Sequence, residues 1–246
     1  MTLYLSQLLL DPFARQVQNE LRSPYEMHRT LCHAFPGLSD EEWKEVRALF
    51  RVDDDRSDAL TLLVQSKNAP DWSAFASRLN GRYLLSEPRV KAWEPHFHEG
   101  QRLRFRLQAN PMMALNTGKD AKRGARCGLY REAERLHWLR AQSERCGFEL
   151  SLFQETLRAS EQAPLMFRGR EHRADLSLEL PVCEMRDLND GRRFALPDRA
   201  NQFSAARFDG ELRVVNPQAF GEAVQSGIGK AKGYGFGLLS VAPATA

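Results

Sequence analysis

A tyrosine and a histidine near the start of a predicted helix are the residues of this chain best suited to acid–base chemistry. Ser23-Pro24-Tyr25-Glu26 has the pattern of a capping box with proline at the first helical position. Tyr25 and His28 are three residues apart, so they share one face of that helix. An imidazole exchanges protons near neutral pH, and a phenol can orient the group that reacts. The pair predicts proton transfer; the alternative is a histidine with no catalytic role.

A glycine-rich segment, GIGKAKGYGFGLLS from Gly227 to Ser240, is the second candidate site. Asn216 and Pro217 predict a helix that ends at Gly227, and a buried strand follows from about residue 236 to 241. This order is the reverse of a P-loop or a dinucleotide-binding fingerprint, in which a strand precedes the glycines. The alternative is a plain helix-to-strand turn that needs only Gly227, as a C-cap.

Glycines let the backbone adopt positive φ and let a ligand approach closely, so such a turn can aim several N–H groups at a phosphate while lysines supply charge. The residues predicted to contact phosphate here are Gly227, Gly229, Lys230, Lys232, Gly233, Gly235 and Gly237.

Basic residues are concentrated in the second half of the chain. The 246 residues have a formal net charge of +3. From Lys119 to Arg145, eight basic residues face four acidic ones, and more arginines follow near residue 170. Such a distribution suits a polyanionic partner. The alternative is a solvated helix face with ion pairs, which we favour for residues 131–145. The basic residues predicted to contact such a partner are Lys119, Lys122, Arg123, Arg158, Arg168, Arg170 and Arg173.

Several other classes of protein fit the sequence poorly. No apolar run of about 18 residues could span a membrane, and no signal-peptide pattern is present, so we expect a cytoplasmic protein without a membrane partner. The four cysteines are scattered and predict reduced thiols rather than a zinc site. We expect no metal or cofactor. The alternative is a metal-dependent nuclease that uses Asp53-Asp54-Asp55 with His96 or His98, although the aspartates fit a solvated hairpin turn better.

The alternation of apolar residues predicts the same βαββαβ order twice. The elements expected are strands at 2–10, 47–52, 60–65, 83–93, 101–109, 148–158, 174–182, 203–215 and 236–241, with helices at 24–35, 72–79, 128–146 and 217–226. One extra strand and a polar insertion at 187–201 interrupt the second series. The fold class predicted is α+β, with two tandem ferredoxin-like (RRM-like) domains at residues 1–94 and 95–246.

The candidate motifs together resemble one protein family. GIGKAKGYGFGLLS resembles the G-Φ-G-x5-G-Φ-G loop of the repeat-associated RNA-binding superfamily of CRISPR systems, and SPYEMHRTLCHAFPG resembles the Y-x-x-H-R segment of its repeat-cleaving members. With FRVDDDRSDALTLLVQS, LRFRLQANP and ARFDGELRV, the chain resembles from end to end the CasE-type CRISPR RNA endoribonucleases of the type I-E Cascade complex.

This resemblance implies metal-independent cleavage of precursor RNA on the 3′ side of each repeat stem-loop. His28 and Tyr25 match the family's catalytic histidine and tyrosine, with the choice of base or acid left open for His28. The partners implied are the repeat RNA, the mature guide RNA and other Cascade subunits. The chain departs from the family where Met112 and Met113 follow Pro111 in place of a basic residue. The competing hypothesis is a non-catalytic RNA-binding subunit of the same superfamily.

Overall fold

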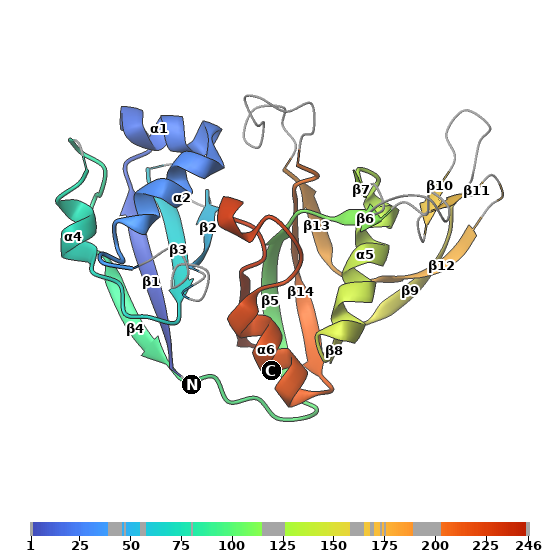
Figure 1. Ribbon diagram of the computed structural model, residues 1–246. Coiled ribbons are helices and arrows are strands. Elements are labelled where there is room, and N and C mark those ends of the chain that lie inside the picture. Colours follow the sequence, from blue (N-terminus) through green and yellow to red (C-terminus); the bar gives the residue numbers. More distant parts are fainter. Residues whose placement is uncertain are drawn as a thin grey trace.

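The computed structural model describes residues 2–38, 46, 48–54, 58–79, 81–114, 126–157, 165–167, 170–172, 174, 176–188 and 203–244. Two antiparallel sheets lie side by side, each with helices packed on one face, and residues 94–101 connect them (Figure 1). Within the described residues, no helix is long and apolar enough to cross a membrane.

The first sheet has the strand order of a ferredoxin-like fold. Its elements are β1 (Leu3–Leu10), α1 (Arg15–Arg22), α2 (Pro24–Cys32), β2 (Leu49–Asp53), β3 (Leu60–Ser66), α4 (Trp72–Ala76) and β4 (Arg89–Trp93). The strands pair in the order β2-β3-β1-β4, all antiparallel. Each helical connection therefore spans one intervening strand, as the predicted βαββαβ order requires.

The second sheet repeats that order. Its elements are β5 (Arg102–Ala109), α5 (Glu132–Arg145), β8 (Phe148–Glu149), β14 (Ala206–Val214), α6 (Pro217–Ser226) and β15 (Leu239–Pro243). β5 lies between β14 and β15, and β8 pairs with the far end of β14. The prediction of two tandem ferredoxin-like units in an α+β protein is confirmed.

The second half carries more hairpins than the sequence predicted. They are β6 (Met112–Ala114) with β7 (Arg126–Gly128), β9 (Leu152–Leu157) with β12 (Leu176–Pro181), β10 (Leu165–Phe167) with β11 (Arg170–His172), and β13 (Glu184–Asp187) with β14. The strand expected at 148–158 is therefore two strands with different partners. The expected helix at 128–146 begins only at Glu132, because Gly128 belongs to β7 and the N–H of Leu129 donates to Pro111 O.

The core of the first half shows where helix prediction succeeded and where it failed. Met27, Leu31 and Phe35 are buried as their spacing predicts, although α2 ends at Cys32 and does not reach Phe35. Helix α1 was not predicted, because RQVQNELR contains few apolar residues and one of its buried residues is Glu20. The strand expected at 83–93 is shorter: only Arg89–Trp93 forms β4, and Leu84 makes an isolated bridge to Leu10.

Candidate active site and nucleic-acid interface

Helix α2 presents Tyr25 and His28 outside the row formed by its buried residues Met27, Thr30 and Leu31. Pro24 occupies the first helical position as expected, but the Ser23 side chain makes no capping hydrogen bond, so the predicted capping box is wrong in its details. Glu26 instead forms an ion pair with Arg29 at 3.1 Å. Tyr25 is 49% exposed and His28 is half-buried. The phenol is open to a ligand, whereas the imidazole is partly enclosed.

A buried polar cluster fixes α2 to the body of the first half. The carboxylate of Glu20 accepts hydrogen bonds from Thr30 Oγ1 at 2.6 Å, from Gln16 Nε2 at 2.9 Å and from the Tyr83 hydroxyl. Burial raises the pKa of Glu20, and burial together with the Glu20 charge raises the pKa of Tyr83. Thr30 lies two residues after His28, so this cluster holds the helix that carries the candidate catalytic pair.

Sequence reasoning missed Glu20. The available signal was its spacing of three residues from Val17, which places both side chains on the same buried face of α1. A charged residue on an apolar helix face indicates a buried partner, and here the partners come from α2 and from the segment before β4.

The glycine-rich segment forms a compact turn between α6 and β15. Asn216 Oδ1 accepts a hydrogen bond from Ala219 N at 3.0 Å, and α6 ends at Gly227 with φ 74°, both as predicted. The segment then folds back on itself, since Ile228 N donates to Gly237 O at 2.9 Å and Gly237 N donates to Gln108 O at 2.7 Å. A single turn of 3₁₀ helix, η1 (Lys232–Tyr234), forms its tip.

Four of the glycines have packing reasons. A Cβ at Gly227 or Gly237 would lie 2.8 Å from a backbone oxygen of the turn itself, and both have positive φ. At Gly229 a Cβ would meet Trp138 at 3.1 Å, and at Gly235 it would meet Phe50 at 3.1 Å. These contacts explain Gly229, Gly235 and Gly237, which a single C-cap at Gly227 leaves unexplained. Phosphate contact at these positions stays a prediction.

Gly233 differs, because it faces His28. A Cβ there would lie 3.8 Å from both Cε1 and Nδ1 of the imidazole, which is ordinary van der Waals separation. Helix α2 packs against η1, so a histidine of the first half and a turn of the second half share one surface (Figure 1). We call this surface, formed by Tyr25, His28 and η1, the seam. Burial lowers the pKa of His28.

The two predicted lysines occupy different environments. Lys232 Nζ donates to Ser226 O at 2.5 Å, so it satisfies a carbonyl at the end of α6. Lys230 is exposed. Lys232 thus has a structural contact that accounts for it, and Lys230 is the lysine of the turn that is open to a ligand.

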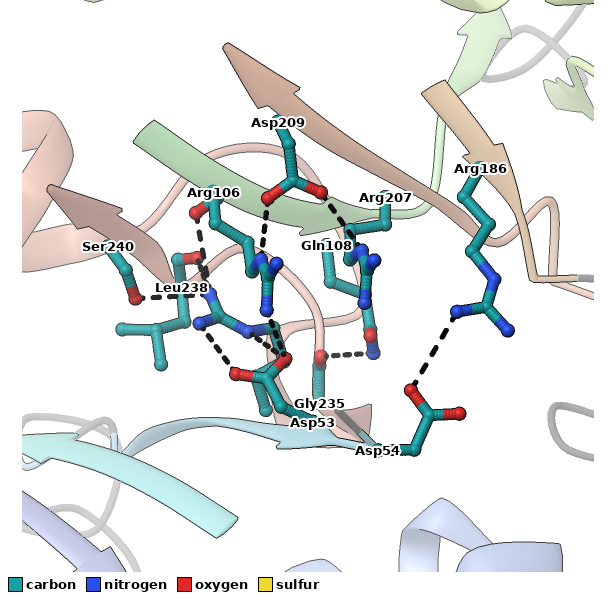
Figure 2. A network of polar contacts seen from close by, with 11 residues as sticks. Asp53, Asp54, Arg106, Gln108, Arg186, Arg207, Asp209, Gly235, Leu238 and Ser240 are labelled. Atoms are coloured by element: carbon teal, nitrogen blue, oxygen red, sulfur yellow. Dashed lines mark hydrogen bonds and ion pairs between the residues drawn. The ribbon is translucent and has the colours of Figure 1, made fainter. Parts of the chain in front are cut away.

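A buried network of arginines and aspartates joins the two halves beside the seam (Figure 2). Arg51 is 2% exposed and donates to both oxygens of Asp53, at 2.8 Å and 3.0 Å. Its third nitrogen lies 3.1 Å from Ser240 Oγ on β15. Arg106 on β5 lies 3.6 Å from Asp53 and 2.5 Å from Asp209. Within the second half, Gln108 on β5 donates to Gly235 O of the glycine-rich turn at 2.9 Å.

This network corrects the interpretation of the three aspartates. Asp53 is the last residue of β2, 7% exposed and paired with arginines, so it is not part of a solvated turn. Asp54 is exposed and lies 3.9 Å from Arg186, and Asp55 is outside the described residues. Sequence reasoning did not identify this buried pair, because Arg106 and Ser240, which contact it, lie more than 50 residues away along the chain.

Metal-ligating and thiol residues are dispersed. Among the described residues, no three or more His, Cys, Asp or Glu side chains gather in a way that could hold a metal ion. His96 Nδ1 lies 2.9 Å from Glu94 O. The four cysteines are free and half-buried, and burial raises the pKa of Cys183 to about 12.

Most of the predicted basic residues lie outside the described part of the chain. These are Lys119, Lys122, Arg123, Arg158, Arg168 and Arg173. For Arg170 the structure gives only its place in β11. On α5, Arg140 pairs with Glu144 at 3.4 Å and with Glu179 at 3.0 Å, as the ion-paired face predicts. Arg135 on the same helix is fully buried and pairs with Asp187 at 3.2 Å, contrary to that prediction.

Comparison with known proteins assigns this α+β chain of two ferredoxin-like units to a family. The chain matches the family model described as "CRISPR associated protein" over residues 3–243, and it belongs to that family. The CRISPR-associated endoribonuclease Cse3 of Thermus thermophilus is 35% identical over 242 residues, which are 98% of this chain and 100% of Cse3. The CRISPR system Cascade subunit CasE of Escherichia coli is 27% identical, covering 98% of this chain and 100% of CasE.

A solved structure agrees with these relatives. Thermus thermophilus Cse3 bound to an RNA representing a pre-cleavage complex superposes with a TM-score of 0.73 at 32% identity, covering 99% of this chain and 100% of that one. The resemblance to CasE-type proteins drawn from the sequence motifs is confirmed.

Proposed function

We propose that this protein is a CRISPR repeat endoribonuclease that cuts precursor RNA on the 3′ side of the repeat stem-loop. It then stays with the mature guide RNA as a Cascade subunit. The support is its full-length similarity to Cse3, which is named an endoribonuclease, and to CasE, which is named a Cascade subunit. The observation that carries the proposal is the seam, where His28 faces Gly233 of the glycine-rich turn.

RNA brings its own nucleophile to this site. The 2′-OH can attack the adjacent phosphate when the two are aligned and a proton is removed, which needs positioning and acid–base groups. The products are a 2′,3′-cyclic phosphate and a 5′-OH. We place the scissile phosphate at the seam, beside His28 and Gly233.

Within this mechanism, we assign His28 as the general base. Its lowered pKa keeps the imidazole neutral at pH 7, so it can accept the proton of the 2′-OH. Tyr25, whose phenol is exposed beside His28, is assigned to orienting the 2′-OH or the phosphate. Lys230 and the N–H groups of the turn stabilise phosphate charge.

We place the stem on the second half of the protein. A-form RNA is recognised mainly through its shape and phosphates, which suits clustered basic side chains. The residues assigned to the stem are Arg158, Arg168, Arg170 and Arg173, and further RNA contacts are assigned to Lys119, Lys122 and Arg123. The proposal includes the boundary between residues 94 and 95 and a cytoplasmic location, where precursor RNA is available.

Incubation with the repeat RNA of its own array, in EDTA, tests the proposed function. We expect a single cut at the 3′ base of the stem, with a cyclic phosphate or its opened 3′-phosphate on one product and a 5′-OH on the other, identified by mass. Binding without cleavage would favour the non-catalytic subunit. Cleavage that needs added Mg²⁺ or Mn²⁺ and leaves a 5′-phosphate would favour a metal-dependent nuclease.

A further inference from the structure

An exposed phenylalanine stands on a well-ordered turn before α1. Phe13 is 86% exposed. Its N–H donates to Asp11 Oδ1 at 2.9 Å, Ala14 N donates to Asp11 O at 3.2 Å, and Asp11 N donates to Tyr83 O at 2.9 Å. The turn is therefore fixed by hydrogen bonds to the buried part of the first half. An aromatic ring held in solvent by such a turn has a large face available to a ligand.

Two arginines line the hollow beside this ring. A hollow beside it is lined by Phe13, Arg15, Asn19, Gly81 and Arg82 together with Asp11. The side chain of Arg82 is 86% exposed and lies 3.9 Å from Asp11. Its positive charge offsets the negative charge of Asp11, the acidic residue among those lining the hollow. A Cβ at Gly81 would meet nothing within 4 Å, so the space above that turn is open.

The basic surface continues along α1 toward the seam. Arg15, Asn19 and Arg22 are all exposed, and their spacing of four and three residues places them on one face of the helix. No described residue forms an ion pair with Arg15 or Arg22. The acidic residue of α1, Glu20, points to the buried side. Eight residues of helix span about 12 Å, and α2 with Tyr25 begins directly after them.

We propose that Phe13, Arg15, Asn19, Arg22 and Arg82, here called the α1 track, bind the single-stranded RNA that continues beyond the scissile phosphate on its 3′ side. Aromatic faces that stack bases and guanidinium groups that contact phosphates are the two components of single-strand binding sites. The proposal rests on the proposed function, which places the stem, 5′ of the cut, on the second half. The strand leaving the seam on the other side meets α1.

This arrangement predicts sequence-tolerant binding. Stacking on Phe13 accepts any base, and the arginines contact phosphates that carry no sequence information. The α1 track therefore adds affinity for uncut RNA whatever sequence follows the scissile phosphate, and that affinity is lost with the downstream product. Cleavage would thus weaken the hold on the released strand while the stem stays bound.

The test compares two RNAs that carry a 2′-deoxy nucleotide 5′ of the scissile phosphate and so cannot be cut. One ends just past that phosphate, and the other extends several nucleotides farther. We expect Phe13→Ala to weaken binding of the extended RNA by about 5-fold to 100-fold and to leave the short RNA unchanged. Arg15→Gln and Arg22→Gln should each lower the salt dependence of binding, as the slope of log K on log[salt], by about 0.7 for the extended RNA alone.

Matched controls come from the exposed edge strand β4. Arg89→Gln and Val90→Ala remove an exposed arginine and an exposed apolar side chain outside the α1 track, and should bind both RNAs as the unmodified protein does. Abasic residues in the extension should abolish the effect of Phe13→Ala, because they leave phosphates but no base to stack.

Two results would overturn the proposal. Phe13→Ala could weaken both RNAs equally, or it could change neither; a loss confined to assembly with other Cascade subunits would assign the surface to a protein partner. The proposed function is judged separately, by cleavage of all-ribose RNA by the unmodified protein in EDTA. If that RNA is not cut, the proposed function fails, whereas normal cutting together with unchanged binding by Phe13→Ala refutes only the α1 track.

Discussion

The two halves of the molecule share one strand order but contribute to the seam from different connections. In the first half, the connection after β1 carries Tyr25 and His28 on α2. In the second half, the connection between α6 and β15 supplies the glycine-rich turn. Neither half by itself places a histidine against that turn. The repeated fold thus serves as a scaffold, and the candidate chemistry depends on where its two copies meet.

The two halves also hold their parts of the seam by different forces. Helix α2 is fixed by side chains, through hydrogen bonds from Thr30 and Tyr83 to the buried carboxylate of Glu20. The turn is fixed by its backbone, through bonds such as Ile228 N to Gly237 O and through glycines that permit close packing. The first half should therefore be sensitive to lost polar groups, and the second to added carbon atoms.

Loss of the imidazole should have the largest effect on activity. We expect His28→Ala to slow single-turnover cleavage by about 10² to 10⁴-fold, because the variant lacks the group that transfers the proton. Its affinity for RNA should stay nearly unchanged. Tyr25→Phe should slow cleavage less. His98→Ala, at an exposed position before β5, is the control and should cut normally. An equal loss of binding and cleavage in His28→Ala would make this residue a contact or structural group.

Breaking the link between the halves should have the largest effect on stability. Arg51→Met leaves the carboxylate of Asp53 buried, with Arg106 at 3.6 Å as its remaining partner (Figure 2). Removal of one member of a buried ion pair costs about 3 to 5 kcal/mol, measurable by urea denaturation. The double variant Arg51→Met with Asp53→Leu should be less destabilised than Arg51→Met. If the double variant is instead more destabilised than Arg51→Met, the expectation that Asp53 is costly to bury without Arg51 is wrong.

Two alanine substitutions in the turn should separate packing from function. Gly237→Ala places a Cβ 2.8 Å from Ile228 O at a φ of 89°, so we expect a loss of about 1 to 3 kcal/mol in the free energy of unfolding.

Gly233→Ala has room for its methyl group, so stability should change by less than about 1 kcal/mol. The methyl group enters the space before His28 and should slow cleavage up to about 100-fold. Normal cleavage by Gly233→Ala would contradict the placement of the scissile phosphate beside His28 and Gly233.

The pH dependence of cleavage should report the environment of His28. A base must be neutral to act, so kcat/KM should rise as pH increases through the pKa of His28 in the free enzyme and then level off. Because burial lowers that pKa below its ordinary value of about 6.5, the plateau should already be reached at neutral pH. Tyr25→Phe should keep the same acidic limb. A rate that falls as pH rises through this range would assign His28 as the acid.

The sequence was informative about local structure and less so about how distant segments meet. The order of helices and strands along the chain followed from the pattern of apolar residues, and the helix before the turn followed from Asn216 and Pro217. Helix α1 escaped detection because its short polar sequence is stabilised by packing around Glu20. Buried ion pairs such as Arg51 with Asp53 look like surface residues in a sequence, since burial is a property of the partners that cover them.

The candidate site divides in the same way. Tyr25 and His28 could be selected from residue types and spacing, but the contact between His28 and Gly233 joins segments about 200 residues apart and needed the structure. The same structure gave Gly227, Gly229, Gly235 and Gly237 packing roles that a motif does not distinguish from ligand contact.

The most direct test of RNA cleavage by its own 2′-OH at the seam is a single 2′-deoxy substitution on the 5′ side of the scissile phosphate, assayed in EDTA. The substitution removes the nucleophile and leaves the stem intact, so we expect the all-ribose RNA to be cut and the substituted RNA to be bound but to remain whole. Cleavage of the substituted RNA would contradict this mechanism, because the attacking group would then have to be water.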